Sequence, residues 1–240
     1  PDMQPTMRRL VMGCAGGLLL LGAACTGLTN AEFRMRRMVK RTYNPEKGVF
    51  PKLDDHIFKL KTRVTGVLDP EKFVETIGFW IFMTESHKPE RIPVLFVHGH
   101  WTGPPALKAL AASLDKRKYE PWFTYYPTGL SLKENAKLLR RNLSRMAALY
   151  KTDTVFVVAY SLGGLVVRQA LRPHDDGHQL PKIPLFIGIA NPWNGSLNVT
   201  AGAKRRISSD SWRDFMPNSE FLVNLFDDPL PEGTDFHMMY

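Results

Sequence analysis

The 240-residue chain has very little cysteine, and both of its cysteines lie near the N-terminus. They are Cys14 and Cys25, so residues 26–240 have no thiol that could form a disulfide. The fold of those residues therefore has to be held by a hydrophobic core and by hydrogen bonds. Hydrophobic residues make up 44% of the chain and charged residues 23%, which is typical of a globular protein. This composition excludes collagen-like and extensively disordered proteins.

Acidic residues are scarce relative to basic ones. The chain holds 32 lysines and arginines against 23 aspartates and glutamates, a formal net charge of +9. Such a charge would suit a nucleic-acid-binding protein, but its distribution argues against one. Residues 1–65 carry 12 basic and 5 acidic side chains, whereas residues 66–240 carry 20 and 18. Because the excess belongs to the N-terminal end and no nucleic-acid reader motif is present, we expect no nucleic-acid partner.

The N-terminal segment has the pattern of a secretory signal. Two arginines at positions 8 and 9 precede an apolar run over residues 10–28, in which small residues are frequent. Residues 21–25, Leu-Gly-Ala-Ala-Cys, look like a bacterial lipoprotein cleavage box, in which Cys25 becomes the lipidated first residue. The leucine lies one position further upstream than that pattern usually has it. An uncleaved membrane anchor is the alternative, because about 20 apolar residues can span a bilayer.

Both alternatives connect the protein with a membrane. Residues 1–29 are expected to be a signal peptide or a membrane anchor. The protein is accordingly expected in the cell envelope, as a periplasmic, outer-membrane lipoprotein or secreted protein, or else anchored by an uncleaved N-terminal helix. The basic cluster within residues 34–41 would then lie near the membrane surface, where anionic lipids attract it. The same cluster is equally typical of a solvated helix face.

Residues 30–90 are expected to connect this segment to the main domain. Asp69 followed by Pro70 predicts the start of a helix, with the aspartate as N-cap and the proline at the first helical position. The apolar residues that follow fall on one helical face, which predicts that the helix continues to residue 81. These residues are Phe73, Val74, Ile77, Trp80 and Ile81.

From residue 91 the sequence alternates between apolar strands and helices. Strands are expected over residues 92–97, 122–126, 154–160, 185–190 and 235–240. Helices are expected over residues 105–114, 132–150 and 162–171, and Ser131 with Glu134 forms a capping box before the longest of them. Strands that are apolar on both faces and alternate with helices indicate an α/β domain, a mostly parallel sheet with helices on both faces.

The strongest chemical signal is the sequence Ala-Tyr-Ser-Leu-Gly-Gly at residues 159–164. It follows an apolar strand and precedes an apolar helix, which is the context of a nucleophile elbow. In such a turn the serine is held in a strained conformation, and the residues two before and two after it must be small. Ala159 and Gly163 meet that requirement. Ser161 would then lie at the N-terminus of a helix, where backbone N–H groups favour a developing negative charge.

A second signal lies about 60 residues earlier, where the strand at 92–97 ends in His98-Gly99. In hydrolases with such an elbow, one oxyanion donor is the amide after the nucleophile, here that of Leu162. The other donor comes from the loop after the earlier strand, here the amide of His100. Gly99 lets the backbone turn so that this amide can point at the substrate oxygen. The side chain of His98 is expected to bond to backbone groups.

Together these motifs resemble the α/β-hydrolase superfamily, in its lipase and esterase branch. The likeness covers residues 91–240 and rests on three segments that look like those of lipases and of GPI-inositol-deacylase-like members. They are Val-Leu-Phe-Val-His-Gly at 94–99, Ala-Tyr-Ser-Leu-Gly-Gly at 159–164 and Leu-Phe-Ile-Gly-Ile-Ala-Asn-Pro-Trp-Asn-Gly-Ser at 185–196. The resemblance implies an acyl-ester hydrolase with a Ser–His–acid triad. Ser161 would be its nucleophile, and the amides of His100 and Leu162 its oxyanion donors.

The remaining triad members depart from the family pattern. The order should be serine, acid, histidine. The histidines after Ser161 are His174 and His178, in an expected surface loop, and His237, within the last expected strand. None has the setting of a catalytic base, and no aspartate stands at the end of a strand. We therefore expect the chain to be C-terminally incomplete, so that the acid and the histidine lie beyond it.

Three functions remain open. The first is a serine ester hydrolase that acts on a lipid or another acyl ester and associates with a membrane through its N-terminus. The second is an acyltransferase, which passes the acyl group to an alcohol instead of water. The third is a catalytically inactive α/β-hydrolase fold used for binding or as a scaffold.

We expect no cofactor and no metal, because the His/Asp loop at residues 174–178 is weak evidence for a metal site.

Overall fold

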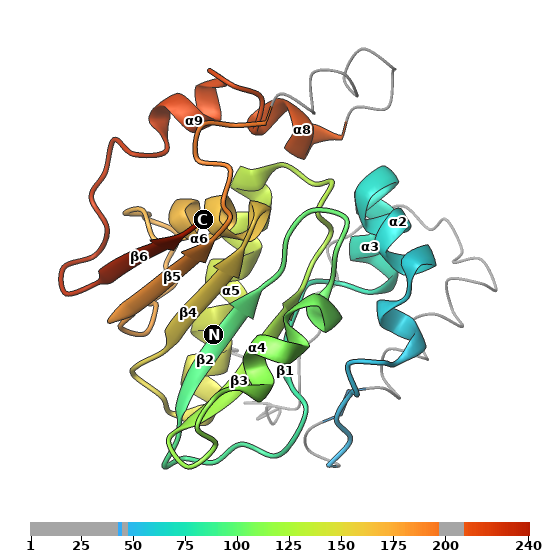
Figure 1. The fold of residues 1–240 in the computed structure, drawn as a ribbon, viewed down its shortest axis with the longest axis vertical. Coiled ribbons are helices and arrows are strands. Elements are labelled where there is room, and N and C mark those ends of the chain that lie inside the picture. The colour runs from blue at the N-terminus through green and yellow to red at the C-terminus, as the bar shows by residue number, and fades with distance from the viewer. Residues whose placement is uncertain (1–42, 45–47, 197–208) are drawn as a thin grey trace, which may run out of the picture.

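A six-stranded sheet forms the centre of the protein (Figure 1). The computed structural model describes residues 43–44, 48–196 and 209–240. Within these residues the strand order is β1-β3-β2-β4-β5-β6. The strands are β1 (Trp80–Met83), β2 (Ile92–Val97), β3 (Tyr119–Tyr125), β4 (Phe156–Tyr160), β5 (Leu185–Ile189) and β6 (Asp235–Met239). β1 pairs antiparallel with β3, and the other four pairings are parallel. The predicted mostly parallel sheet is confirmed.

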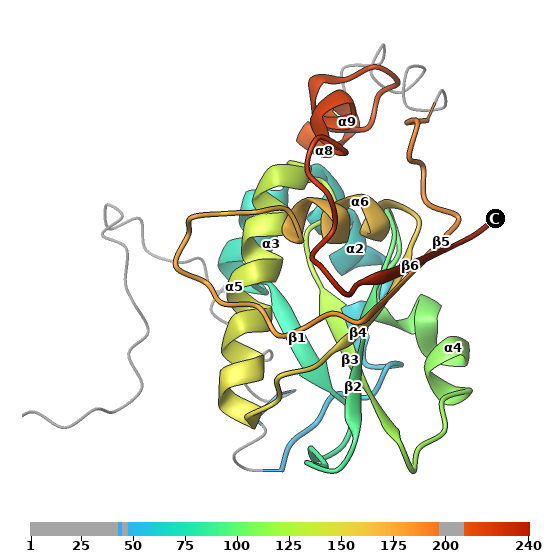
Figure 2. The same ribbon diagram turned by 90° about the vertical axis from the view of Figure 1, so that its left-hand side faces the viewer.

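Helices cover both faces of the sheet, as predicted (Figure 2). One face carries α5 (Leu132–Tyr150) and α6 (Leu162–Ala170). The other carries the short η3 (Pro104–Leu107) and α4 (Lys108–Ala112), together with the N-terminal elements η2 (His56–Phe58), α2 (Leu60–Leu68) and α3 (Pro70–Thr76). Two further short helices, α8 (Asp210–Asp214) and α9 (Glu220–Asn224), lie beyond the carboxyl ends of the strands (Figure 1).

The sheet separates two hydrophobic cores. In β2, Leu95 and Val97 face the core beneath α5 and α6, whereas Val94 and Phe96 face the core beneath α4 and the N-terminal helices. All four side chains are at most 3% exposed. Because successive side chains of a strand point to opposite faces, a strand covered on both sides must be apolar at every position. The uninterrupted apolar sequence of β2 is explained in this way.

The expected helix over residues 70–81 is too long. Asp69 caps α3 as predicted, with its carboxylate accepting the N–H of Lys72 at 3.2 Å, but the helix ends at Thr76. Gly78 follows with φ of +87° and donates its N–H to the carbonyl of Phe73 at 3.0 Å. A glycine in the left-handed region is a common helix stop.

The residues after Gly78 form a strand that the sequence analysis missed. Trp80 and Ile81 belong to β1, where they lie opposite Tyr125 and Thr124 of β3. The sheet therefore begins upstream of the expected boundary at residue 91. Residues of η2 and α3 contribute Ile57, Phe58 and Phe73 to the second core, so this part of the expected connecting region is packed into the fold.

A buried arginine fastens the loop between α6 and β5. Arg140, on α5, is 6% exposed and forms two hydrogen bonds with the carboxylate of Asp176, with N–O distances of 2.7 and 3.1 Å. Its guanidinium also donates to the carbonyl of Ala170 at 2.8 Å. The paired guanidinium holds the pKa of Asp176 well below its usual range. This one side chain therefore connects α5, α6 and the following loop.

We expect Arg140→Ala to lower the free energy of unfolding by about 3 kcal/mol, because the substitution leaves a carboxylate and a buried carbonyl without their donor. Arg141→Ala is the matched control. Arg141 is exposed and forms no hydrogen bond or ion pair with the described residues, so its loss should change stability by less than about 0.5 kcal/mol. Urea unfolding of both variants measures the difference, and equal stabilities would contradict the role of Arg140.

Candidate active site

Ser161 lies in a strained turn between β4 and α6. Its backbone has φ of 51° and ψ of −125°, which is unusual for a residue other than glycine. The turn is held by hydrogen bonds on both sides. The N–H of Ser161 donates to the carbonyl of Ile189 at 2.8 Å, and its carbonyl accepts the N–H of Gly164 at 3.0 Å. This is the strand, sharp turn and helix that a nucleophile elbow requires.

Small residues let the elbow approach the end of β2. A Cβ atom on Gly163 would lie 2.6 Å from the carbonyl oxygen of Val97 and 2.8 Å from that of His98. A Cβ atom on Gly99 would lie 2.8 Å from the Cβ of Ser161. Both distances are too short for a side chain to fit without movement. The structure thus brings together the two motifs that were singled out in the sequence, because β2 and β4 are neighbouring strands.

Two backbone N–H groups border the Ser161 side chain. Leu162 is the first residue of α6, and a helix has no internal partner for the N–H at that position. His100 follows Gly99, whose Cα packs against the serine. Within the described residues, neither N–H forms a hydrogen bond. Among the described residues, both N–H groups are therefore without a partner and able to donate.

Asn191, in the loop after β5, supports the elbow, although it was not among the predicted site residues. Its side-chain amide donates to the carbonyls of Ala159 at 3.2 Å and Ser161 at 2.7 Å. The side chain also fills the space beside Gly164 and Gly188. The signal was present in the segment 185–196, but nothing in a single sequence indicates which of its polar residues turns back toward the serine.

His98 is a buried structural residue, as predicted. Its Nδ1 lies 3.0 Å from the carbonyl oxygen of Gly99, and the hydroxyl of Tyr126 donates to the carbonyl of His98 at 2.6 Å. Complete burial lowers the pKa of His98 to about 4, because a charged ring would lose its hydration. The imidazole is therefore neutral at physiological pH.

The ring of His100 is held on both sides. The indole N–H of Trp212 donates to Nε2, so the proton of the neutral ring is on Nδ1, which lies 3.2 Å from the carbonyl oxygen of Thr128. Burial lowers the pKa of His100 to about 4. Since both ring nitrogens have partners, the imidazole of His100 is not free to serve Ser161 as a base.

Trp212 belongs to α8, which packs over the loops that follow β2 and β3. The N–H of Ser211 donates to the carbonyl of Gly129 at 3.2 Å. The carboxylate of Asp214 accepts the N–H of Leu132, the first residue of α5, at 2.6 Å. Burial raises the pKa of Asp214. Asp214 therefore helps to cap α5.

The three histidines that follow Ser161 in the sequence lie apart from the elbow. His174 and His178 are in the loop after α6, where His174 approaches the carbonyl of Arg172 at 2.9 Å. His237 is an exposed residue of β6. Within the described residues, no histidine is hydrogen-bonded to the Ser161 hydroxyl. Cys25 and the expected signal or anchor segment lie outside the described residues.

The described part of the chain contains no group of three or more histidine, cysteine, aspartate or glutamate residues that could hold a metal ion. It also contains no helix that is long and apolar enough to cross a bilayer.

No model of a protein family matches the chain, and no curated protein matches it. Its fold is shared with solved structures of lipases. The mature form of the lipase BlEst2 from Bacillus licheniformis aligns with 67% of this chain and 70% of its own at 20% identity, with a TM-score of 0.52. Its propeptide form aligns at the same identity with a TM-score of 0.53, but over 38% of its own length. The phospholipase PlaB from Legionella pneumophila aligns over 62% of this chain and 38% of its own at 15% identity, with a TM-score of 0.47.

At these identities the likeness concerns the fold. It confirms the expected relationship in fold to lipases and esterases, together with the predicted α/β architecture.

The close packing at the elbow can be tested with Gly163→Ala. We expect this variant to lose about 2–3 kcal/mol of stability, because the added methyl group would displace the backbone at the end of β2. Gly103→Ala is the control, since a Cβ there first meets the flexible side chain of Arg63 at 3.3 Å. Thermal or urea unfolding compares them, and equal losses would show that the elbow is not tightly packed.

The two neutral histidines make stability depend on pH. Between pH 6.5 and about 4 the unfolded chain binds protons at His98 and His100 that the folded state does not. The contribution of these two residues to the free energy of unfolding is therefore fully present above pH 6.5 and is lost as the pH drops toward 4. In His100→Gln this fall should be shallower by about 1 kcal/mol per pH unit. Urea unfolding between pH 4 and 8 measures the slope. His237→Gln, on exposed β6, is the control, and an unchanged slope in His100→Gln would refute the assignment.

Proposed function

With the α/β-hydrolase fold as the premise, we propose that the protein is a serine ester hydrolase whose nucleophile is Ser161. The observation that carries this proposal is the strained backbone of Ser161 at the point where β4 meets α6. A serine held at positive φ stores strain that an ordinary loop would relax, and such strain is concentrated at functional sites. The side chain is half-buried and lies at the N-terminus of a helix, which is favourable for an oxyanion.

The proposed reaction proceeds through an acyl-enzyme. The hydroxyl oxygen of Ser161 attacks the carbonyl carbon of an ester while a general base takes its proton. The carbonyl oxygen becomes negative, and the amides of His100 and Leu162 donate hydrogen bonds to it. The base then protonates the departing alcohol. Water attacks the acyl-enzyme in the same way and releases the acid. We assign no described histidine to the role of base, since His98 and His100 are held by other groups.

Acyl esters, including lipids, are the proposed substrates. Trp101 follows the proposed oxyanion residue and is 37% exposed, so it offers apolar surface beside the elbow. BlEst2, whose fold is shared, is a lipase by name. We also propose that the protein acts in the cell envelope, on the grounds of the N-terminal sequence alone.

A binding or scaffold protein is the second candidate. It is favoured by one observation, that no histidine of the described residues is hydrogen-bonded to the Ser161 hydroxyl. An inactive protein could keep the elbow as a packing element because Gly163 and Asn191 fit it closely to β2 and β5. An acyltransferase would use the same serine and differ in the acceptor of the acyl group.

A fluorophosphonate probe and a p-nitrophenyl ester test the proposal on the whole protein. We expect the probe to label Ser161, and Ser161→Ala to lower the rate of ester hydrolysis at least about 1000-fold without a change in stability. Ser113→Ala, at the exposed end of α4, is the matched control and should keep full activity. A folded protein that neither reacts with the probe nor hydrolyses esters would refute the enzyme and favour the scaffold. Preferential transfer to an added alcohol would identify an acyltransferase.

A further inference from the structure

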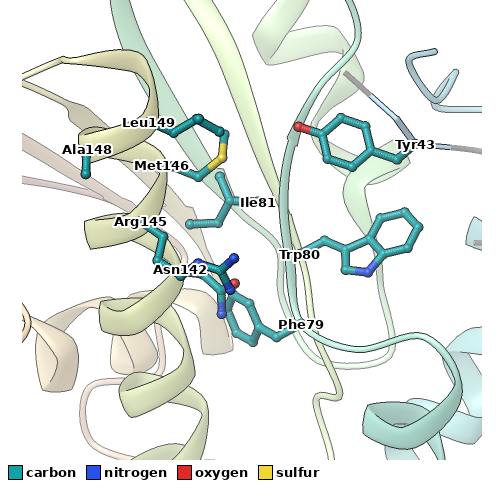
Figure 3. Close-up of a pocket in the computed structure, with 9 residues that line it drawn as sticks. All are labelled: Tyr43, Phe79, Trp80, Ile81, Asn142, Arg145, Met146, Ala148 and Leu149. Atoms are coloured by element: carbon teal, nitrogen blue, oxygen red, sulfur yellow. The ribbon is translucent and has the colours of Figure 1, made fainter. Parts of the chain in front are cut away.

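A cavity of about 590 Å³ lies between α5 and the edge strand β1 (Figure 3). It is lined by Tyr43, Phe79, Trp80, Ile81, Asn142, Arg145, Met146, Ala148 and Leu149. None of these residues belongs to the elbow or to the loop after β2. β3 and β2 lie between β1 and β4, so three strand spacings, roughly 14 Å, separate this edge of the sheet from the strand that carries Ser161. The cavity is therefore distinct from the candidate active site.

Most of the cavity wall is apolar. Phe79 immediately precedes β1, Ile81 belongs to β1, and Met146 comes from the facing side of α5 (Figure 3). The indole N–H of Trp80 donates to the carbonyl of Ile77 at 2.7 Å, so the indole offers the cavity mainly carbon surface. Such a wall favours a hydrocarbon chain, and the volume lies within the range of ligand sites in proteins.

The cavity also has one cationic group. Arg145 is the only charged residue among those that line it, and its guanidinium points from α5 toward the space beside Phe79 (Figure 3). Among the described residues, Arg145 forms no ion pair and no hydrogen bond. The neighbouring Asn142 donates its side-chain N–H to the carbonyl of Leu138 at 2.8 Å, which leaves its oxygen as an acceptor. No acidic side chain lines the cavity to neutralise the arginine.

We propose that this cavity binds a long-chain carboxylate, with its head group on Arg145 and its hydrocarbon chain along Phe79, Ile81 and Met146. A guanidinium presents two parallel N–H groups that match the two oxygens of a carboxylate. A single arginine balances one negative charge, which suits a carboxylate better than a phosphate monoester of nearly two charges. The apolar wall supplies the rest of the complementarity. This proposal goes beyond the proposed function and does not require Ser161 to be a nucleophile.

Trp80 lines the cavity on the side of β1 opposite Phe79 and Ile81 (Figure 3), so its indole reports a chain that extends around this edge strand. Bromine atoms quench indole fluorescence on contact, so titration of the whole protein with 9,10-dibromostearate should give saturable quenching. In Trp80→Phe most of this quenching should disappear, whereas calorimetry should still detect binding of laurate. Ser161→Ala should bind laurate as the unchanged protein does, which keeps this test separate from that of the proposed function.

Two further variants test the head group and the chain. Arg145→Gln should weaken laurate binding about 10-fold, whereas Arg141→Gln, an exposed arginine one turn earlier that does not line the cavity, should leave it unchanged. Ala148→Trp should abolish binding by filling the space.

Dodecyltrimethylammonium, with the same chain length and the opposite charge, should bind at least 10-fold more weakly than laurate. Equal binding of the two amphiphiles, or laurate binding that survives both Arg145→Gln and Ala148→Trp, would overturn the proposal.

Discussion

The contact between the first turn of α6 and the end of β2 is the constraint on which the site depends. Gly163 faces the carbonyls of Val97 and His98, and Gly99 faces the Cβ atom of Ser161. The two glycines allow this close approach, and the pairing of β2 with β4 sets the position of the serine relative to the loop after β2. The strained conformation of Ser161 persists because this packing and the hydrogen bonds from Asn191 over-determine it.

The elements around this contact are joined by hydrogen bonds between residues that lie far apart in the sequence. Trp212 of α8 reaches His100, 112 residues away, and Asp214 reaches the first turn of α5, 82 residues away. The short helix α8 is thereby fixed beyond the carboxyl ends of the strands. At the C-terminal end of α6, the hydrogen bonds of Arg140 hold the following loop in a similar way.

Local patterns were sufficient to predict much of this arrangement. The apolar strands, the Ser131 cap of α5 and the turn at Ser161 all depend on residues that are neighbours in the sequence. The structure confirms the strands and the cap, and it places Ser161 in a sharp turn between a strand and a helix. The predictions were wrong or incomplete where tertiary contacts determine the secondary structure or the position of a side chain. Trp80 and Ile81 fit the period of a helix, but Gly78 stops α3 and pairing with β3 turns them into a strand. Asn191 and Trp212 form hydrogen bonds with residues far away in the sequence, and the local periodicity of apolar residues does not predict such contacts.

The two histidines beside Gly99 are neutral, and this affects how the acidic product of ester cleavage leaves the site. With pKa values of about 4, His98 and His100 bring no positive charge near Ser161 at neutral pH. A developing oxyanion would therefore be met by amide dipoles, which are directional and act over a short range. The carboxylate that ester cleavage produces would find no fixed cation among these groups to retain it. In the reaction we propose, the two imidazoles thus do not hold the acidic product.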